Sequence, residues 1–175
     1  MQALAVWKAA VMDHANFLEG LLGLLSETRI RYCVIGGQGV NAYVDPLISL
    51  DLDIVVAVDQ LEFLEAQLRR HYSVNVFPHP LNVSAKGSNL RVQIQTDPRY
   101  AAFAERAEPR EVLGLVMPVA RIDDLLQGKI WAASDPTRRP AKRRKELLDI
   151  ERVIEAYPEL KSQVPADILR RLDSD

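Results

Sequence analysis

Apolar residues recur either at helical spacing or in short alternating runs along most of the chain, and the two periodicities together predict a mixed α/β (α+β) fold. Helical spacing predicts helices over residues 3–26, 60–70, 100–106, 120–133, 140–156 and 164–172. Short apolar or alternating runs predict strands over residues 32–35, 50–56, 72–77, 82–85, 90–96 and 112–119. This order predicts one domain, in which an α/β body over residues 1–117 begins with a helix and a helical part follows over residues 118–175.

The strand expected over residues 50–56 places two carboxylates on one face. Asp51 and Asp53 are two residues apart, and strand side chains alternate between faces. The apolar residues between and around them are expected to point into a core; they are Leu50, Leu52, Ile54 and Val56. Two neighbouring carboxylates on a half-buried face resist joint ionisation, so without a cation one should have a raised pKa. The pair therefore predicts a site for a hard divalent cation, Mg²⁺ or Mn²⁺.

A pair of glycines follows the strand expected over residues 32–35. Gly36 and Gly37 stand where that strand would turn into a short helix. Backbone N–H groups at the start of a helix point outward and favour phosphate. A side chain at Gly37 would hinder close approach of a phosphate and is expected to force an unfavourable φ. The pair therefore predicts a nucleotide-binding turn.

Gly36-Gly37, about a dozen further residues and then Asp51-Leu52-Asp53 resemble the signature of the nucleotidyltransferase superfamily, which has the polymerase-beta-like fold. The resemblance runs from about residue 30 to about residue 153 and is strongest to AbiEii-like and related uncharacterised bacterial domains. It implies a Mg²⁺- or Mn²⁺-dependent enzyme that transfers a nucleoside monophosphate from a nucleoside triphosphate to an acceptor. The acceptor, which could be RNA, protein or a small molecule, is left open by the resemblance.

Similar enzymes hold the metal with a third carboxylate on a neighbouring strand, and here that position falls on Gln93. Asp97 has the same strand parity but is expected to lie too far along the chain, and Leu47 stands where an arginine is common in the superfamily. Two alternatives therefore stay open. One is a catalytically weak or inactive nucleotide-binding protein of a toxin–antitoxin-like system. The other is an interaction module that uses the C-terminal helices.

The C-terminal part contains candidate phosphate ligands. Lys129 resembles the helix lysine that similar proteins direct at nucleotide phosphates, although a lysine at a helix C-terminus would also favour the helix dipole. Residues 145–149 resemble the K/R-D-x-x-D segment of the superfamily, in which the later acid orients the basic residue. Glu146 and Asp149 would be its acids, with an ordinary helix surface as the alternative. The strongest basic run covers residues 138–145 and could bind a phosphate backbone such as that of tRNA, or simply be a solvated helix face.

Composition excludes some structures and locations but does not indicate a function. The chain has 175 residues, a formal net charge of −2 and one cysteine, Cys33, which excludes an intramolecular disulfide and predicts a core position. His14 lies on the apolar stripe of the first predicted helix and is expected to be packed or partly exposed rather than catalytic. No signal-peptide pattern or membrane-length apolar run is present in the sequence, so the expectation is a cytoplasmic protein without a membrane partner.

Overall fold

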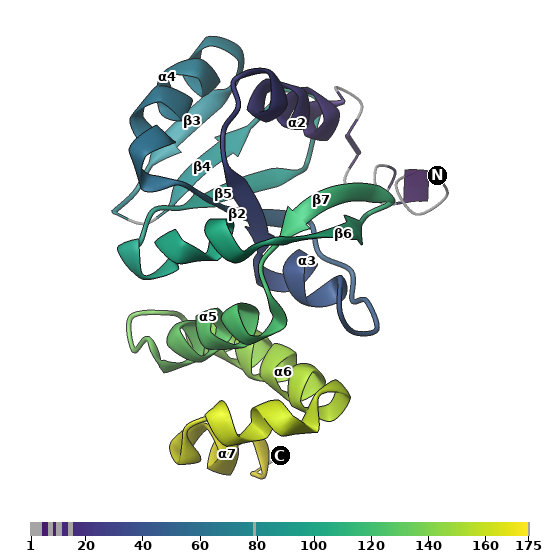
Figure 1. The fold of residues 1–175 in the computed structure, drawn as a ribbon, viewed down its shortest axis with the longest axis vertical. Helices are drawn as coiled ribbons and strands as arrows, with labels where there is room; N and C mark the ends of the chain where they lie inside the picture. Colours follow the sequence, from purple (N-terminus) through teal and green to yellow (C-terminus); the bar gives the residue numbers. More distant parts are fainter. Residues whose placement is uncertain (1–4, 7–8, 10–11, 14–15, 79, 175) are drawn as a thin grey trace.

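The computed structural model describes residues 5–6, 9, 12–13, 16–78 and 80–174, and Figure 1 shows their arrangement. A mixed sheet lies across the middle of the molecule, with helices on both of its faces. The strands are β1 (Tyr32–Ile35), β2 (Asp51–Val56), β3 (Ser73–Val76), β4 (Leu81–Ser84), β5 (Arg91–Gln95), β6 (Glu108–Val112) and β7 (Leu115–Val119). The expected mixed α/β class is therefore confirmed.

The sheet order is β3-β4-β5-β2-β1-β7-β6, which puts the two strands of the sequence signature next to each other at its centre. β1 runs antiparallel to β2, while β2 runs parallel to β5 and β1 parallel to β7. The outer pairs β3/β4, β4/β5 and β6/β7 are antiparallel. Parallel neighbours are usually buried in a sheet, and this placement shields β1, β2 and β5 from solvent at the edges.

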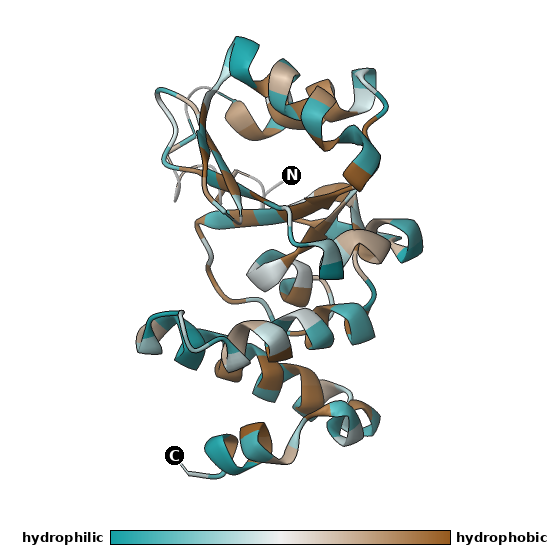
Figure 2. Cartoon of the chain, turned by 90° about the vertical axis from the view of Figure 1, so that its left-hand side faces the viewer, coloured by the Kyte–Doolittle hydropathy of each residue, from teal (hydrophilic) through white to brown (hydrophobic). Residues whose placement is uncertain are grey.

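Two helices cover one face of the sheet, α2 (Phe17–Glu27) and α4 (Leu61–His71), which is preceded by the 3₁₀ turn η1 (Val58–Gln60). Their buried leucines and the apolar side of β2 belong to one core. In Figure 2 the helical ribbons are divided between brown and teal, as expected of helices with one buried side. Leu52, Ile54 and Val56 are buried as predicted, but Leu50 lies outside β2 and is exposed.

The predicted helix over residues 3–26 is interrupted before α2. Asn16 has a left-handed backbone with φ 51°, and α2 begins at Phe17. The buried carboxylate of Asp13 accepts hydrogen bonds from the backbone N–H groups of Phe17 and Leu18, at 2.9 and 3.2 Å. It thus satisfies donors that the first helical turn leaves open. His14 lies outside the described residues.

The expectation of a single extended segment over residues 112–119 is wrong. The chain makes a hairpin there, with β6 and β7 joined by Leu113 and Gly114, which both have positive φ. Positive φ at both central residues matches the right-handed twist of a two-residue hairpin. The alternating pattern could not reveal the turn because Leu113 is not a typical turn residue, and only Gly114 marked it.

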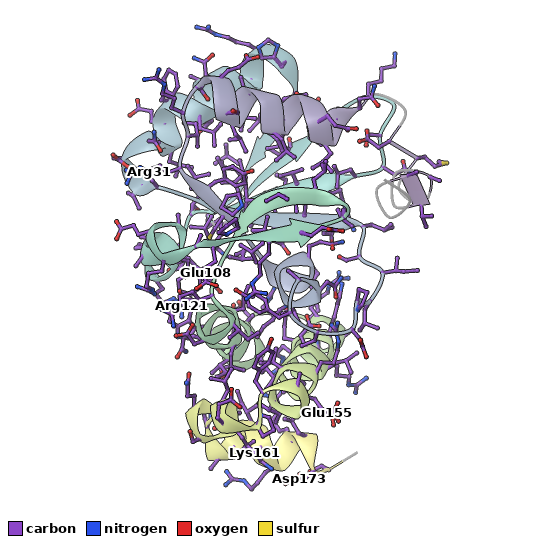
Figure 3. The ribbon with its side chains drawn as sticks, turned by 45° about the vertical axis from the view of Figure 1, so that its right-hand side comes forward. Arg31, Glu108, Arg121, Glu155, Lys161 and Asp173 are labelled. Atoms are coloured by element: carbon purple, nitrogen blue, oxygen red, sulfur yellow. The ribbon has the colours of Figure 1, made fainter. Side chains whose placement is uncertain are left out.

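The opposite face of the sheet carries α3 (Gly36–Asn41), the 3₁₀ helix η2 (Pro98–Arg106) and the C-terminal helices. These are α5 (Ile122–Ser134), α6 (Pro140–Ala156), η3 (Pro158–Gln163) and α7 (Ala166–Leu172). Glu155, Lys161 and Asp173 lie on the outer surface of this part, away from the sheet (Figure 3). None of the helices in the described ranges is long and apolar enough to span a bilayer.

Candidate active site

The centre of the sheet brings three predicted polar positions together. In the parallel ladder between β2 and β5, Asp53 is paired with Gln93 and Asp51 with Arg91. Side chains at paired positions share a face, so Asp51, Asp53 and Gln93 point to the side that α3, α5 and α6 cover. Gln93 therefore stands beside Asp53, in the position that the sequence assigned to it.

Gly36 is the glycine on which the site geometry depends. It has φ +66°, and a Cβ atom built on it would lie 2.1 Å from Oδ2 of Asp53. Only glycine allows the chain to pass this close to the carboxylate while turning from β1 into α3. The expectation of an unfavourable φ at Gly37 is wrong, because Gly37 lacks a positive φ and its Cβ would meet Ser49 at an ordinary 3.8 Å.

The two carboxylates differ in their surroundings. Burial raises the pKa of Asp53 to about 6, opposed by Lys129 and supported by the nearby Asp51 and Glu146 carboxylates. The expectation that one of the pair has a raised pKa is met at Asp53, but desolvation rather than its neighbour is the largest cause. Asp51 is less enclosed, and its Oδ1 lies 2.8 Å from Nε of Arg91.

The donor set around these carboxylates fits a hard cation. Asp51, Asp53 and Gln93 offer oxygen atoms, which Mg²⁺ and Mn²⁺ prefer. The pKa of Asp53 is raised in the metal-free protein because its carboxylate has lost water. A bound cation would replace that water and stabilise the ionised carboxylate. Two carboxylates suit one metal better than two, and the described residues contain no cluster of three histidine, cysteine or acidic side chains that could hold a metal.

Lys129 lies in the middle of α5, so the alternative of a lysine that only serves a helix C-terminus is wrong. Its residue is 6% exposed, and its Nζ lies 2.7 Å from both Oε2 of Glu146 and Oδ2 of Asp149. Burial alone would lower the pKa of Lys129, but these two carboxylates raise it above the ordinary value. Lys129 is therefore a fixed cation, held in place by the two acids that the sequence singled out.

Two arginines complete this ionic cluster. Arg138 places Nη1 3.1 Å from Oε1 of Glu146, and Arg152 places Nη1 2.7 Å from Oδ1 of Asp149. Arg152 also donates to Oδ1 of Asn41 at 2.9 Å and to the backbone carbonyl of Asp45. The cluster thus joins α5, α6 and the end of α3. Sequence reasoning missed Arg152, whose only signal was its position three residues after Asp149.

The candidate metal and nucleotide ligands line one cavity, which we call the inner cavity. It measures about 140 Å³ and lies between the sheet and the helices α3, α5 and α6. The candidates on its wall are Gly36, Gly37, Asp51, Asp53, Gln93 and Lys129. Carboxylates stand on the strand side and cations on the helix side, an arrangement that can hold a metal-bound polyphosphate between them.

The basic run at the start of α6 also reaches this cavity. Arg138, Lys142 and Lys145 line it, whereas Arg139 and Arg144 are exposed and do not. The run is therefore neither wholly a solvated face nor a separate surface. Part of it faces the same space as Asp51 and Asp53.

Comparison with known proteins gave structural neighbours alone. The sequence matches no protein-family model and no curated protein. The antibiotic-resistance factor ANT(2'')-Ia aligns with a TM-score of 0.56 at 14% identity, over 87% of this chain and 94% of its own. The lincosamide antibiotic adenylyltransferase LnuA, in a lincomycin-bound structure, aligns with a TM-score of 0.52 at 13% identity, over 78% and 95%.

A third neighbour is an antigenic nucleotidyltransferase-like protein from Paracoccidioides brasiliensis. Its TM-score is 0.52 at 16% identity, and the alignment covers 85% of this chain and 75% of the neighbour. Identities this low establish a common fold and no more. The three alignments show that the chain has a nucleotidyltransferase fold.

Proposed function

We propose that this protein is a metal-dependent nucleotidyltransferase, which moves a nucleoside monophosphate from a nucleoside triphosphate to an acceptor hydroxyl. The observation that carries the proposal is the inner cavity, where Asp51, Asp53, the Gly36 turn and the buried Lys129 face one another. The α/β body and the C-terminal helices each supply one wall of this cavity, so we propose that they work as one domain. We also infer a cytoplasmic location, where nucleoside triphosphates are available.

In the proposed reaction the acceptor oxygen bonds to the α-phosphorus while the bond from that phosphorus to the pyrophosphate oxygen breaks. A Mg²⁺ or Mn²⁺ ion held by Asp51 and Asp53 would supply charge neutralisation for the triphosphate. Lys129 and Lys145 stand on the opposite wall, where they can bind the phosphate oxygens. The hydroxyl proton passes to water, because Asp51 and Asp53 are the proposed ligands of the metal ion.

Gly36 and Gly37 leave the backbone open beside the carboxylates, which suits close approach of the triphosphate. The clustered acids Glu146 and Asp149 keep Lys129 charged and directed into the cavity. Orientation of this kind accelerates a reaction because the phosphate ligands need no rearrangement when charge develops.

A second candidate function is nucleotide binding with little or no transfer, as in the inactive member of a toxin–antitoxin-like pair. The observation that favours it is Gln93, which lies beside Asp53 where a third carboxylate would stand. A glutamine can offer an oxygen to a metal but can neither accept a proton from the acceptor nor add negative charge.

The two functions are separated by incubating the protein with each α-labelled nucleoside triphosphate, Mg²⁺ or Mn²⁺, and acceptor fractions of RNA, protein and small molecules. Label on one fraction supports transfer. The matched pair of variants is Asp53→Asn, which should abolish both labelling and metal-dependent triphosphate binding, and Asp59→Asn, which alters only a surface pair with Arg31.

Binding of a triphosphate without labelling of any fraction would support the second function. Neither binding nor labelling, or equal behaviour of Asp53→Asn and the wild type, would overturn both.

A further inference from the structure

A second, larger cavity adjoins the inner one, and we call it the outer cavity. It measures about 670 Å³ and shares Gln93, Tyr100, Arg138 and Lys142 with the inner cavity. A molecule seated in it would border the position beside Asp53 where the proposed transfer takes place. The outer cavity is therefore the place for the acceptor, and its lining determines which acceptor fits.

The lining has an excess of positive charge. Four of its side chains are cationic and two are acidic; the cations are Arg99, Arg138, Arg139 and Lys142, and the acids are Asp97 and Asp135. No other lysine, arginine, aspartate or glutamate of the described residues lines this cavity. Because like charges repel at close range, an acceptor with several ammonium groups would meet more repulsion than attraction here.

Both acids already have partners within the protein. Asp97 Oδ2 lies 2.6 Å from Nη2 of Arg99, and its Oδ1 accepts the backbone N–H of Arg99 at 2.9 Å. Asp135 Oδ1 accepts from the backbone N–H and the hydroxyl of Thr137 at 2.9 and 2.7 Å, and these bonds lower the pKa of Asp135. Both carboxylates therefore already accept hydrogen bonds from donors within the protein.

Two of the four cations, Arg139 and Lys142, differ from the others in having no acidic partner among the described residues. Arg138 is held by Glu146, but Arg139 and Lys142 form no ion pair with any residue in the described ranges. Lys129 and Lys145 line the inner cavity and are available to the triphosphate. Arg139 lines only the outer cavity. Arg139 is therefore the cation most available to an acceptor, and its guanidinium suits a carboxylate or phosphate.

The rest of the wall is apolar and aromatic. Phe77 and Pro78 stand at the end of β3, and Phe77 is 51% exposed. Trp131 already has Phe103 stacked at 6.0 Å and the Arg99 guanidinium 5.0 Å from its ring centre. Phe77 thus offers the more accessible ring for an acceptor that has a flat apolar group.

From this lining, and resting on the proposed nucleotidyl transfer, we infer that the acceptor is an anionic hydroxyl compound. Its carboxylate or phosphate binds Arg139 and Lys142, and an apolar ring packs on Phe77. Phe77 follows β3, far from the basic run in the sequence, so its combination with Arg139 and Lys142 exists only in the folded chain.

Three probes test the charge preference: phenyl β-D-glucoside, and phenyl β-D-glucuronide and phenyl 2-amino-2-deoxy-β-D-glucoside, each of which differs from the glucoside in one group. They share a ring and free hydroxyls and are neutral, anionic and cationic, respectively. Binding is measured by calorimetry on the full chain with Mg²⁺, with and without a non-hydrolysable α,β-methylene triphosphate. We expect the glucuronide to bind about five- to tenfold more tightly than the glucoside, and the amine to bind most weakly.

Matched variants locate the binding site. Arg139→Gln should remove most of the preference for the anion, whereas Arg144→Gln, an exposed arginine of the same run that lines neither cavity, should keep it. Phe77→Ala should weaken the binding of all three probes to the same degree. Phe63→Ala, which removes a ring with similar exposure on α4, should leave the binding of all three unchanged.

Equal binding of the three probes, tighter binding of the amine, or an unchanged preference in Arg139→Gln would overturn the inference. Failure of the proposed function has a different signature, because the charge preference is measured by binding and needs no transfer. Label transfer to a polycationic acceptor such as tobramycin at least as efficient as transfer to the glucuronide would also overturn it, while leaving nucleotidyl transfer intact.

Discussion

The two walls of the inner cavity are built on opposite electrostatic principles. On the helix wall, Lys129 meets two carboxylates at 2.7 Å, and each carboxylate meets an arginine in turn. On the strand wall, the half-buried Asp53 lies beside Asp51 and has a raised pKa, and its partner on β5 is the neutral Gln93. The helix wall is therefore balanced within the protein. On the strand wall Asp51 has a cationic partner in Arg91, and we propose that a bound metal ion balances Asp53.

The difference teaches where stability and function reside. Breaking a balanced buried ion cluster costs free energy of folding, because a charge is left without its partner. Removing charge from an unbalanced site relieves desolvation and repulsion, and so stabilises the fold while removing its chemistry. Four substitutions sharpen this contrast.

The largest effect is expected for Lys129→Met on the helix wall. Loss of the ammonium leaves Glu146 and Asp149 facing each other, so we expect a loss of about 3 kcal/mol in the free energy of unfolding, measured by urea denaturation. Lys145→Met is the control, since Lys145 lines the same cavity but is exposed and should change stability by less than about 0.5 kcal/mol. Equal stability of the two variants would show that the cluster is not balanced as described.

Gly36→Ala should have the next largest effect. A side chain there combines a positive φ with a Cβ 2.1 Å from Oδ2 of Asp53, so we expect a loss of about 2 kcal/mol or more and weaker metal binding. Gly37→Ala, where the nearest contact is 3.8 Å, should fold as the wild type does. Thermal denaturation of both variants measures the difference, and a more damaging Gly37→Ala would contradict the assignment of strain to Gly36.

Asp53→Asn should stabilise the metal-free protein above pH 6. Because the folded pKa of Asp53 is raised from 3.8 to about 6, its contribution to stability is fully present below about pH 4 and is lost as pH rises through about 6. The wild type should thus lose roughly 2 kcal/mol across this window, and Asp53→Asn should not.

Chemical denaturation at several pH values, with and without Mg²⁺, measures this effect. Mg²⁺ should restore stability to the wild type at pH 7.5 and leave Asp53→Asn unchanged. Asp59→Asn, on an exposed surface pair, should follow the wild-type pH profile. A wild-type profile without the loss of stability between pH 4 and 7 would show that the strand wall is balanced without a cation.

The smallest effect on folding is expected for Gln93→Glu. A third carboxylate beside Asp53 should lower metal-free stability by about 1 kcal/mol and raise Mn²⁺ affinity and turnover several-fold. Gln93→Asp tests the shorter side chain. Gln95→Glu is the control, because Gln95 lies two residues further along β5, where its Oε1 accepts from the backbone of Thr96 and Asp97. Robust wild-type transfer that Gln93→Glu abolishes would show that the position is not a missing carboxylate.

Much of the fold follows from the sequence. Short apolar and alternating runs predicted the central strands, and helical spacing predicted the helix over residues 140–156 with the bounds of α6. The two glycines and the alternation of Asp51 and Asp53 predicted the strand wall, because strand geometry converts spacing directly into a shared face. The hairpin of β6 and β7 was missed, since its turn depends on a leucine with positive φ that local propensity disfavours.

The tertiary structure alone decided what the helix wall does. Sequence spacing did not decide whether Lys129 is a phosphate ligand or a charge at a helix end. It also did not decide whether the basic run is a nucleic-acid surface or a solvated face. Packing of α5 against α6 buried Lys129 between Glu146 and Asp149 and turned Arg138, Lys142 and Lys145 toward the carboxylates. Periodicity specifies which side of one element is apolar, but the partner of a buried charge depends on contacts between elements far apart in the chain.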